Sequence, residues 1–327
     1  METPPIRDRT ILVTGGAGFV GSHLVDTLVE DNDVRVLDDL SSGTRQYVHE
    51  DATLVEGDIR NRDALEEATR DVDVIFHEAA IVDVTETVER PEETNQVNLE
   101  AGLELLECAR REDARVVVAS SAAVYGHPAE LPVAETTPTD PASPYGVQKL
   151  ALDRYAQVYE RLYGLPTVTL RYFNIYGPRQ QGPYSGVIST FLEQARAGEP
   201  ITVEGDGEQT RDFVHVEDVV RANLLAATTT DVGEAYNVGT GQRTSILELA
   251  ETVREATDAD VPIVHRPPRK GDVRHSGADV SKARRKLGFE ATVGLEPGIR
   301  RLVNEESTET VRDLEDAVAD GEGESYS

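Results

Sequence analysis

A tyrosine and a lysine in the middle of this sequence have the types and the spacing that proton transfer requires. The segment "SPYGVQK" (143–149) places Tyr145 and Lys149 four residues apart, so on a helix the two side chains share a face. A free tyrosine has a pKa of about 10, and a neighbouring ammonium group favours the phenolate. Tyr145 could then act as a base near neutral pH. Such a pair alone is usually a surface feature, so its meaning depends on the surrounding elements.

A serine ends the apolar run that precedes this pair. In "SSAAVYG" (120–126), Ser121 follows a strand-like stretch, and Ala122 and Ala123 come next. Ligands of parallel sheets bind along the edge where the strands end. The sequence therefore predicts a hydroxyl at a ligand-binding edge, followed by two side chains that can neither donate nor accept a proton.

A glycine-rich turn near the N-terminus predicts a dinucleotide site. Gly15, Gly18 and Gly21 separate the first strand-like run from a helix-like segment. Glycines there permit a tight turn and close approach to a pyrophosphate, which the helix N-terminus favours. Asp38 ends the second strand-like run and would accept hydrogen bonds from the adenosine ribose. Asp39 is its neighbour and no arginine adjoins, so the pattern favours NAD over its phosphorylated form.

The elements that must position these residues alternate along the chain. Strand-like runs lie at 9–15, 33–39, 52–58, 72–80, 114–121 and 167–174, and helix-like stretches separate them. This alternation predicts an α/β fold, a Rossmann-type doubly wound parallel sheet, with a smaller interleaved C-terminal domain. We expect residues 8–174 and 214–245 to form the cofactor-binding domain and residues 175–213 and 246–314 to form the smaller one. The acidic, apolar-poor segment 315–327 is expected to be a mobile tail.

The composition limits the classes of partner. The 327 residues include 32 basic and 61 acidic ones, a net charge of −29, which disfavours nucleic acid and anionic membranes as partners. The many acidic residues and only four lysines are typical of a protein that works in a cytoplasm with molar salt. The alternative is an ordinary acidic protein. The single cysteine excludes an intrachain disulfide and a cysteine-rich metal site, and no metal is expected. The N-terminus has no apolar signal region, and no long apolar run occurs, so a soluble cytoplasmic protein is expected.

Together, these motifs resemble the extended short-chain dehydrogenase/reductase family, specifically its nucleotide-sugar epimerases and dehydratases. The matching segments are "TGGAGFVG", "GDIR", "HEAA", "SSAAVYG", "YGVQK", "RYFNIYGPRQ", "TRDFVHVEDV" and "YNVGTG", in the expected order over roughly residues 10–300. The resemblance implies that Tyr145 takes a proton from a sugar hydroxyl while hydride passes to NAD. It implies that Ser121 hydrogen-bonds the same oxygen and that Lys149 binds the nicotinamide ribose. It also implies a homodimer formed by the helices near 95–111 and 145–163.

The resemblance also implies the remaining site residues. Asp58 and Ile59 would flank the adenine, and Ala79, Ala80, Asn95, Tyr172 and Phe173 would line the nicotinamide half. Asn174, Arg211 and Arg269 would contact the diphosphate-sugar, and Asp272 would accept from the nucleoside ribose. Further expected cofactor contacts are Phe19, Val20, Asp39, Ser41, Ser42, Gly43 and Val82, and further expected substrate contacts are Val187 and Ser276.

The two alanines favour one reaction within the family. The 4,6-dehydratases carry an Asp-Glu pair at the positions of Ala122 and Ala123, and the glucuronate decarboxylases typically have an acid at the second. A chain with hydride-transfer residues alone is expected to be a 4-epimerase. A dehydratase or reductase acting on a nucleotide sugar is the enzymatic alternative. The non-enzymatic alternative is an NAD-binding scaffold or redox sensor, but such proteins commonly lose the tyrosine or lysine that this chain keeps.

One small residue bears on the choice of sugar. Epimerases restricted to small hexoses resemble one another in a bulky tyrosine where this chain has Ser276, four residues after Asp272. A serine there leaves room beside carbon 2 of the sugar. We therefore expect N-acetylated hexosamine nucleotides to be accepted as well as UDP-hexoses, with uridine the expected base.

Overall fold

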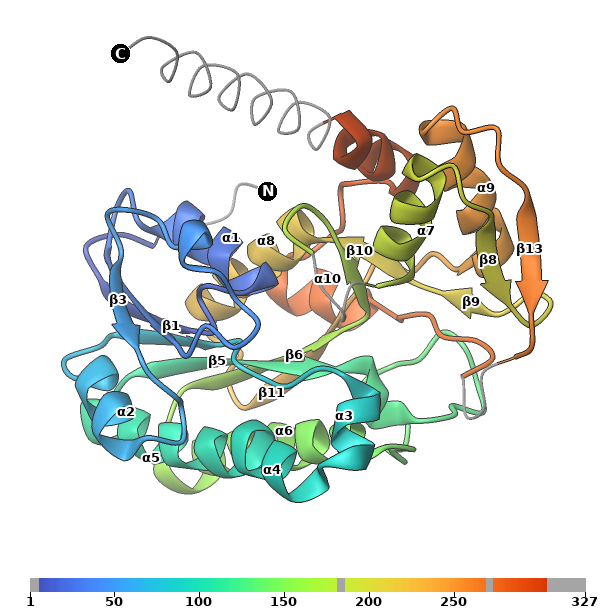
Figure 1. Cartoon of the computed structure of the whole chain (residues 1–327). Coiled ribbons are helices and arrows are strands. Elements are labelled where there is room, and N and C mark those ends of the chain that lie inside the picture. The colour runs from blue at the N-terminus through green and yellow to red at the C-terminus, as the bar shows by residue number, and fades with distance from the viewer. Residues whose placement is uncertain (1–5, 181–185, 269–272, 305–327) are drawn as a thin grey trace, which may run out of the picture.

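A sheet of seven parallel strands forms the centre of the protein. The computed structural model describes residues 6–180, 186–268 and 273–304, and the strand order is β3-β2-β1-β4-β5-β6-β11 (Figure 1). The order reverses between β1 and β4, the position where doubly wound sheets bind ligands. The predicted fold class is confirmed. The strands are β1 (Thr10–Thr14), β2 (Asp33–Asp38), β3 (Thr53–Glu56), β4 (Val74–His77), β5 (Arg115–Ser121), β6 (Thr167–Tyr172) and β11 (Glu234–Val238).

Helices cover both faces of this sheet, because alternate strand residues are apolar on each side. Ile11 and Val13 of β1 pack on the core beneath α1 (Phe19–Leu28) and α8 (Val216–Thr228), whereas Leu12 packs on the core of the opposite face. Figure 1 shows this division. No described helix is both long and apolar enough to cross a membrane. The opposite face carries α2 (Arg62–Thr69), α3 (Val84–Glu89), α4 (Pro91–Asn95), the π-helical turn η2 (Gln96–Glu100), α5 (Ala101–Glu112) and α6 (Pro144–Tyr163).

A smaller unit with its own apolar cluster lies beside the sheet. It contains α7 (Val187–Arg196), β8 (Ile201–Glu204), α9 (Ile246–Ala256) and β13 (Ile263–Arg266), and β8 pairs in parallel with β13 (Figure 1). Short strand pairs connect it to the sheet: β7 (Asn174–Tyr176) with β10 (Phe213–His215), and β9 (Thr210–Arg211) with β12 (Thr244–Ser245). The exact domain limits and the tail, which lies outside the described residues, stay predictions. The remaining short elements are η1 (Arg45–Tyr47), η3 (Ala122–Tyr125) and α10 (Ser281–Leu287).

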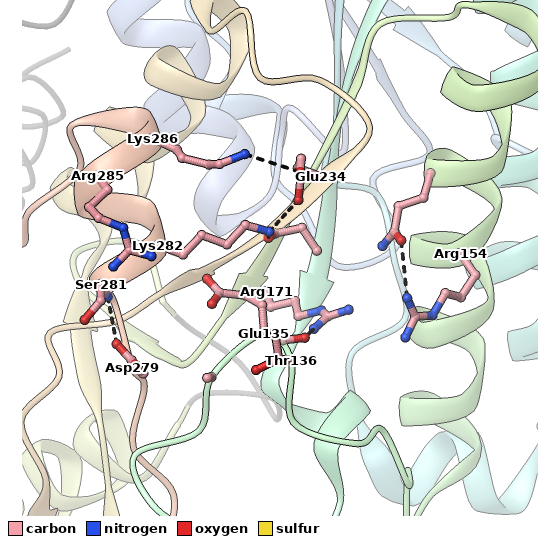
Figure 2. A pocket seen from close by; sticks show the side chains of 13 residues that line it. Glu135, Thr136, Arg154, Arg171, Glu234, Asp279, Ser281, Lys282, Arg285 and Lys286 are labelled. Carbon is pink, nitrogen blue, oxygen red and sulfur yellow. Dashed lines mark hydrogen bonds and ion pairs between the residues drawn. The ribbon is translucent and has the colours of Figure 1, made fainter.

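Polar side chains cover the outer edge of β11. Glu135 accepts a hydrogen bond from the Asn237 backbone N–H at 2.8 Å, and Lys282 donates to the Ala235 carbonyl at 2.7 Å. These bonds satisfy backbone groups that a free edge would leave open to another strand. A crevice of about 620 Å³ opens beside them between α6 and α10 (Figure 2). None of the predicted site residues lines it.

Candidate active site

The glycine turn between β1 and α1 is too tightly packed for side chains. Gly15 has a φ of +71°, and a Cβ there would lie 2.7 Å from the backbone nitrogen of Ala79. A Cβ on Gly21 would lie 2.1 Å from the Gly15 carbonyl oxygen, so the helix and the turn are in direct backbone contact. Gly18 caps α1 without a side-chain hydrogen bond, and Phe19 and Val20 begin the helix. The amide groups of this first turn are arranged as in phosphate-binding helices.

Asp38 ties the end of β2 to this turn. Its carboxylate accepts hydrogen bonds from the backbone N–H groups of Ala17 at 3.0 Å and Leu40 at 2.9 Å. Burial raises the pKa of Asp38, while these two N–H groups oppose the change. A carboxylate has about four acceptor positions, so two remain for ribose hydroxyls.

The loop after Asp38 has the features expected for NAD. Asp39 accepts hydrogen bonds from the N–H and the hydroxyl of Ser41, and the exposed Ser42 precedes Gly43. A Cβ on Gly43 would lie 2.7 Å from the Ala17 carbonyl, so this loop packs on the glycine turn. Arg45, the first arginine along the loop, forms an ion pair with Glu56. Arg45 therefore does not provide the cation that a 2′-phosphate would need beside Asp38.

The residues expected at the adenine lie just after β3. Arg60 binds the Asp58 carboxylate through its Nε at 2.9 Å and lowers the pKa of Asp58. Ile59 beside it is 7% exposed. Asp58 and Ile59 therefore present a paired acid and a buried apolar side chain after β3, two strands from the glycine turn of β1.

A buried asparagine holds the loop after β4. Asn98 accepts a hydrogen bond from the Ile81 N–H at 2.8 Å and donates to the Ile81 carbonyl at 2.9 Å and to Gln148 of α6 at 2.8 Å. Asn95 donates to Glu100 at 3.0 Å, and its place at the nicotinamide stays a prediction. The loop itself contains Ala79, Ala80 and Val82, of which Val82 is 50% exposed.

The serine, tyrosine and lysine come together at the ends of β5 and α6. Ser121 is the last residue of β5, and its hydroxyl interacts with the Tyr145 phenol and accepts the Ala123 N–H at 3.1 Å. The Lys149 Nζ lies 5.9 Å from the centre of the Tyr145 ring and donates to the Ala119 carbonyl at 3.0 Å. The structure thus brings the three predicted residues into one cluster.

Burial dominates the electrostatics of this cluster. It raises the pKa of Tyr145 to about 12, although the Ser121 hydrogen bond acts in the opposite direction. Burial also lowers the pKa of Lys149 to about 8. Burial therefore outweighs the effect on Tyr145 that the tyrosine–lysine spacing predicts. The phenol needs a further positive charge nearby to act as a base at neutral pH, which the oxidised nicotinamide would provide.

A carboxyl group that no sequence motif singled out lies beside this cluster. Tyr172 donates its hydroxyl proton to Glu78 at 2.8 Å, and the charge of Glu78 acts on both Tyr145 and Lys149. Glu78 is the one acid between the buried strand residues of β4 and the two alanines in "VIFHEAA". An acid between a buried strand and two expected cofactor contacts could have identified Glu78 as a site residue.

A second missed group, behind the cluster, is a buried ion pair. Arg171 of β6 contacts Asp153 of α6 through its Nε at 2.7 Å, and the two side chains are 1% and 0% exposed. Arg171 also donates to the Tyr125 hydroxyl at 2.8 Å, and Ser120 donates to Asp153 at 3.4 Å. This network joins β5, β6 and α6, the elements that carry the reactive side chains.

The expected substrate residues follow the sheet into the smaller unit. Phe173 is buried against Val124, Tyr125 and Ala278, on the side opposite Tyr172. Asn174 donates its side-chain amide to the Asp212 carbonyl at 3.1 Å.

The other expected substrate residues come from three segments of the smaller unit. Val187 begins α7, and Arg211 lies in β9, half-buried. The Ser276 N–H donates to the carbonyl of Thr210, the neighbour of Arg211, at 3.0 Å, so Ser276 lies next to this strand. Arg269 and Asp272 fall outside the described residues.

These features test whether NAD fits the site. The turn that excludes a Cβ at Gly15 and Gly21, the α1 N-terminus without a side-chain cap, and the acceptors left on Asp38 match a pyrophosphate and an adenosine ribose. When bound, NAD supplies a hydride acceptor that can also return the hydride. The residues present fit this group.

Comparisons with known proteins agree with this geometry. The sequence profile of the NAD dependent epimerase/dehydratase family matches residues 11–239. A putative UDP-glucose 4-epimerase of Methanocaldococcus jannaschii is 42% identical over 299 residues, which cover 90% of this chain and 97% of that protein.

Two solved structures share the fold. One is the UDP-N-acetylglucosamine 4-epimerase from Methanobrevibacter ruminantium in complex with UDP-N-acetylmuramic acid, with a TM-score of 0.89, 36% identity, and coverage of 93% of this chain and 100% of that one. The other is the UDP-glucose 4-epimerase from Thermotoga maritima with UDP-glucose, with a TM-score of 0.89, 39% identity, and coverage of 92% and 99%. The chain belongs to the NAD-dependent epimerase/dehydratase family, and its cofactor is NAD.

Proposed function

We propose that this protein catalyses the 4-epimerisation of a nucleotide-diphospho-hexose, with UDP-glucose and UDP-galactose or their N-acetylhexosamine forms as substrates. The observation that carries the proposal is the cluster of Ser121, Tyr145 and Lys149 beside the NAD site, with alanines at the next two positions. The Tyr145 phenolate takes the proton of the 4-hydroxyl while the hydride leaves carbon 4 for the cofactor. Ser121 hydrogen-bonds the same oxygen, and the hydride returns to the opposite face as Tyr145 gives back its proton.

The two alanines support epimerisation over elimination of water. Ala122 and Ala123 begin η3 directly after Ser121 and are partly buried. Elimination needs an acid for the departing hydroxyl and a base for a carbon-bound proton, and neither methyl group can serve. A 4,6-dehydratase remains the alternative only if carboxylates from another segment take these roles.

The smaller unit supports a nucleotide-sugar substrate. Arg211 and Ser276 lie on adjacent backbone segments, and Asn174 is held by hydrogen bonds to Asp212. We infer that Arg211 and Arg269 bind the diphosphate, that Asp272 binds the nucleoside ribose, and that Asn174 and Val187 contact the substrate. Residues 8–174 with 214–245 would form the NAD-binding domain, and residues 175–213 with 246–314 the substrate domain.

The size of Ser276 leads to a prediction on sugar choice. Ser276→Tyr should reduce turnover of UDP-N-acetylglucosamine by about 10-fold or more and leave UDP-glucose within about 3-fold. Even one extra methylene in a pocket changes discrimination by roughly 1–3 kcal/mol, and a tyrosine ring is larger. Steady-state rates on both substrates measure this, with Ser276→Ala as the matched control. An equal loss on both sugars would contradict the assignment.

The overall function is tested without added cofactor. The purified chain is offered UDP-glucose and UDP-N-acetylglucosamine separately, and proton NMR follows the anomeric signals. We expect the galacto epimer to appear, because hydride that returns to the sugar regenerates the NAD. A 4-keto-6-deoxy product would indicate a dehydratase, and no reaction even with NAD supplied would refute the substrate assignment.

The surface and the composition support two further proposals. The exposed apolar residues Val147, Tyr155, Leu162 and Tyr163 of α6 support a homodimer formed through α5 and α6, which light scattering can test. The net charge of −29 supports a cytoplasmic protein of a halophile, whose activity should rise with molar potassium chloride. A monomer, or activity lost at high salt, would overturn the respective proposal.

A further inference from the structure

Glu78 occupies a constrained position at the end of β4. Asn223 of α8 donates its amide to the Tyr172 hydroxyl at 2.8 Å and to the Val219 carbonyl at 3.0 Å. A tyrosine hydroxyl has one proton. Of the two acceptors within reach of the Tyr172 hydroxyl, Glu78 lies at 2.8 Å and the Asn223 Oδ1 at 3.2 Å, and the Asn223 amide already donates to this hydroxyl, so the geometry favours Glu78 as the acceptor. The carboxyl group is therefore held by a defined donor from β6, which is itself fixed from α8.

The charged groups that face Glu78 come from α6. His77 pairs with Val118 of β5, so Glu78 follows beside Ala119, whose carbonyl accepts a hydrogen bond from Lys149 at 3.0 Å. The negative charge of Glu78 raises the pKa of Lys149 and of Tyr145, and Lys149 lowers the pKa of Glu78. The preceding residue of β4, His77, is buried and has its pKa lowered to about 3, so it carries no charge near neutral pH. Asn223 is uncharged. One ammonium group thus faces two groups that can each become negative.

We infer that Glu78 is a positioning residue that controls the protonation of Tyr145, because its carboxylate competes with the Tyr145 phenolate for the positive charge of Lys149. When Glu78 is ionised, it compensates Lys149 and opposes ionisation of the phenol. When Glu78 is protonated, the Lys149 charge is left to favour the phenolate. The inference rests on the proposed function, in which Tyr145 is the base.

The surroundings make this competition relevant near neutral pH. Burial raises the pKa of Glu78 to about 7, while the Tyr172 hydrogen bond and Lys149 act in the opposite direction. Glu78 would then change its charge in the range where the enzyme works. The proton of Tyr145 and the proton of Glu78 belong to one coupled titration.

Glu78→Gln is the direct test, because the amide keeps the size of the side chain and an oxygen that can accept the Tyr172 proton. The full-length NAD-loaded protein is labelled with ¹³C at the tyrosine Cζ, and Tyr145→Phe assigns the Tyr145 signal among the 11 tyrosines. We expect the Tyr145 pKa to fall by on the order of one pH unit in Glu78→Gln, as removal of a nearby like charge does. The acid limb of the kcat/KM profile should move to lower pH by the same amount.

Tyr172→Phe is the second variant. It keeps the carboxyl group and removes the hydrogen bond that favours its ionised form, so the Tyr145 pKa should move in the same direction by less. If Glu78→Gln does not fold, this smaller downward movement is the deciding result. An unchanged or raised Tyr145 pKa in a folded variant would overturn the inference.

The NMR titration also separates this inference from the proposed function. It detects the ionisation of Tyr145 whether or not any sugar is converted. If the Tyr145 pKa falls in Glu78→Gln but neither UDP-sugar is epimerised by the unmodified protein, the coupling stands and the proposed function is wrong. If UDP-glucose is epimerised and the Tyr145 pKa does not move in Glu78→Gln, the proposed function stands and the inference about Glu78 is wrong.

Discussion

Asp153→Asn should destabilise the protein far more than a typical surface substitution. Asp153 and Arg171 are 0% and 1% exposed and lie 2.7 Å apart. Burial lowers the pKa of Arg171, but the hydrogen bond and charge of Asp153 raise it more, so its pKa lies above the ordinary value. The guanidinium cannot lose its proton when Asp153 is neutralised, since arginine stays charged in proteins. The variant therefore retains a buried cation without its counter-ion.

The size of this effect follows from the burial. Removing one partner of a buried ion pair costs about 3–5 kcal/mol, a large part of the roughly 5–15 kcal/mol that stabilises a typical native protein. The network adds to the cost, because Ser120 also donates to Asp153. Replacing both partners with apolar residues of similar volume, Asp153→Leu with Arg171→Met, should cost less than Asp153→Asn alone, since no charge is left buried.

Denaturant unfolding at low and molar salt measures these differences. The control is Asp31→Asn, which breaks the exposed Arg7–Asp31 pair, whose side chains are 63% and 51% exposed. That change should cost at most about 1 kcal/mol and vanish in molar salt, whereas the cost of Asp153→Asn should persist because buried pairs are screened little. A loss below about 1 kcal/mol for Asp153→Asn, or one that molar salt removes, would refute this reasoning.

Two other predictions concern the cofactor site. Gly21→Ala should abolish NAD binding in isothermal titration, because the added Cβ would lie 2.1 Å from the Gly15 carbonyl oxygen. The control is Gly164→Ala: Gly164 has a φ of +70° and open space around it, so this change should cost only about 1–2 kcal/mol of stability and leave NAD affinity unchanged. Lys149→Met should inactivate the enzyme yet stabilise it near pH 7. The pKa of buried Lys149 is lowered from 10.5 to about 8; the unfolded chain therefore binds more protons between these values, and stability of the unmodified protein should rise by roughly 3 kcal/mol as pH increases from about 8 to about 10.5. A Lys149→Met protein whose stability rises equally over that range would contradict this assignment.

The sequence predicted the parts of the site that depend on local pattern. Apolar runs located the first six strands of the sheet, and the glycines, Asp38 and the Tyr145–Lys149 spacing are local features whose positions follow from those strands. The role of Asn98 depends on which face of the helix is buried. Asn98 is spaced three and seven residues before Ala101 and Leu105, two buried apolar residues, so the helical period could have identified it. Glu78 and the Arg171–Asp153 pair were missed because their partners lie on other elements, and no periodicity along one segment reveals contacts between β4, β6 and α6.

The active site and the buried ion pair have opposite effects on the folded state. Lys149 and Glu78 have pKa values moved toward their neutral forms, so each destabilises the fold when it is charged at its working pH. Glu78 directly follows β4, Lys149 lies in the second turn of α6, and Tyr145 must stay close to Ser121 at the end of β5. The Arg171–Asp153 pair fixes α6 to β6 one helical turn after Lys149 and reaches β5 through Ser120. Moving these elements apart would leave two unpaired charges buried, which is strongly unfavourable. The ion pair can therefore hold β5, β6 and α6 in place although charged Lys149 and Glu78 destabilise the fold. Asp153→Asn should therefore lower kcat as well as stability, even at temperatures where the variant remains folded.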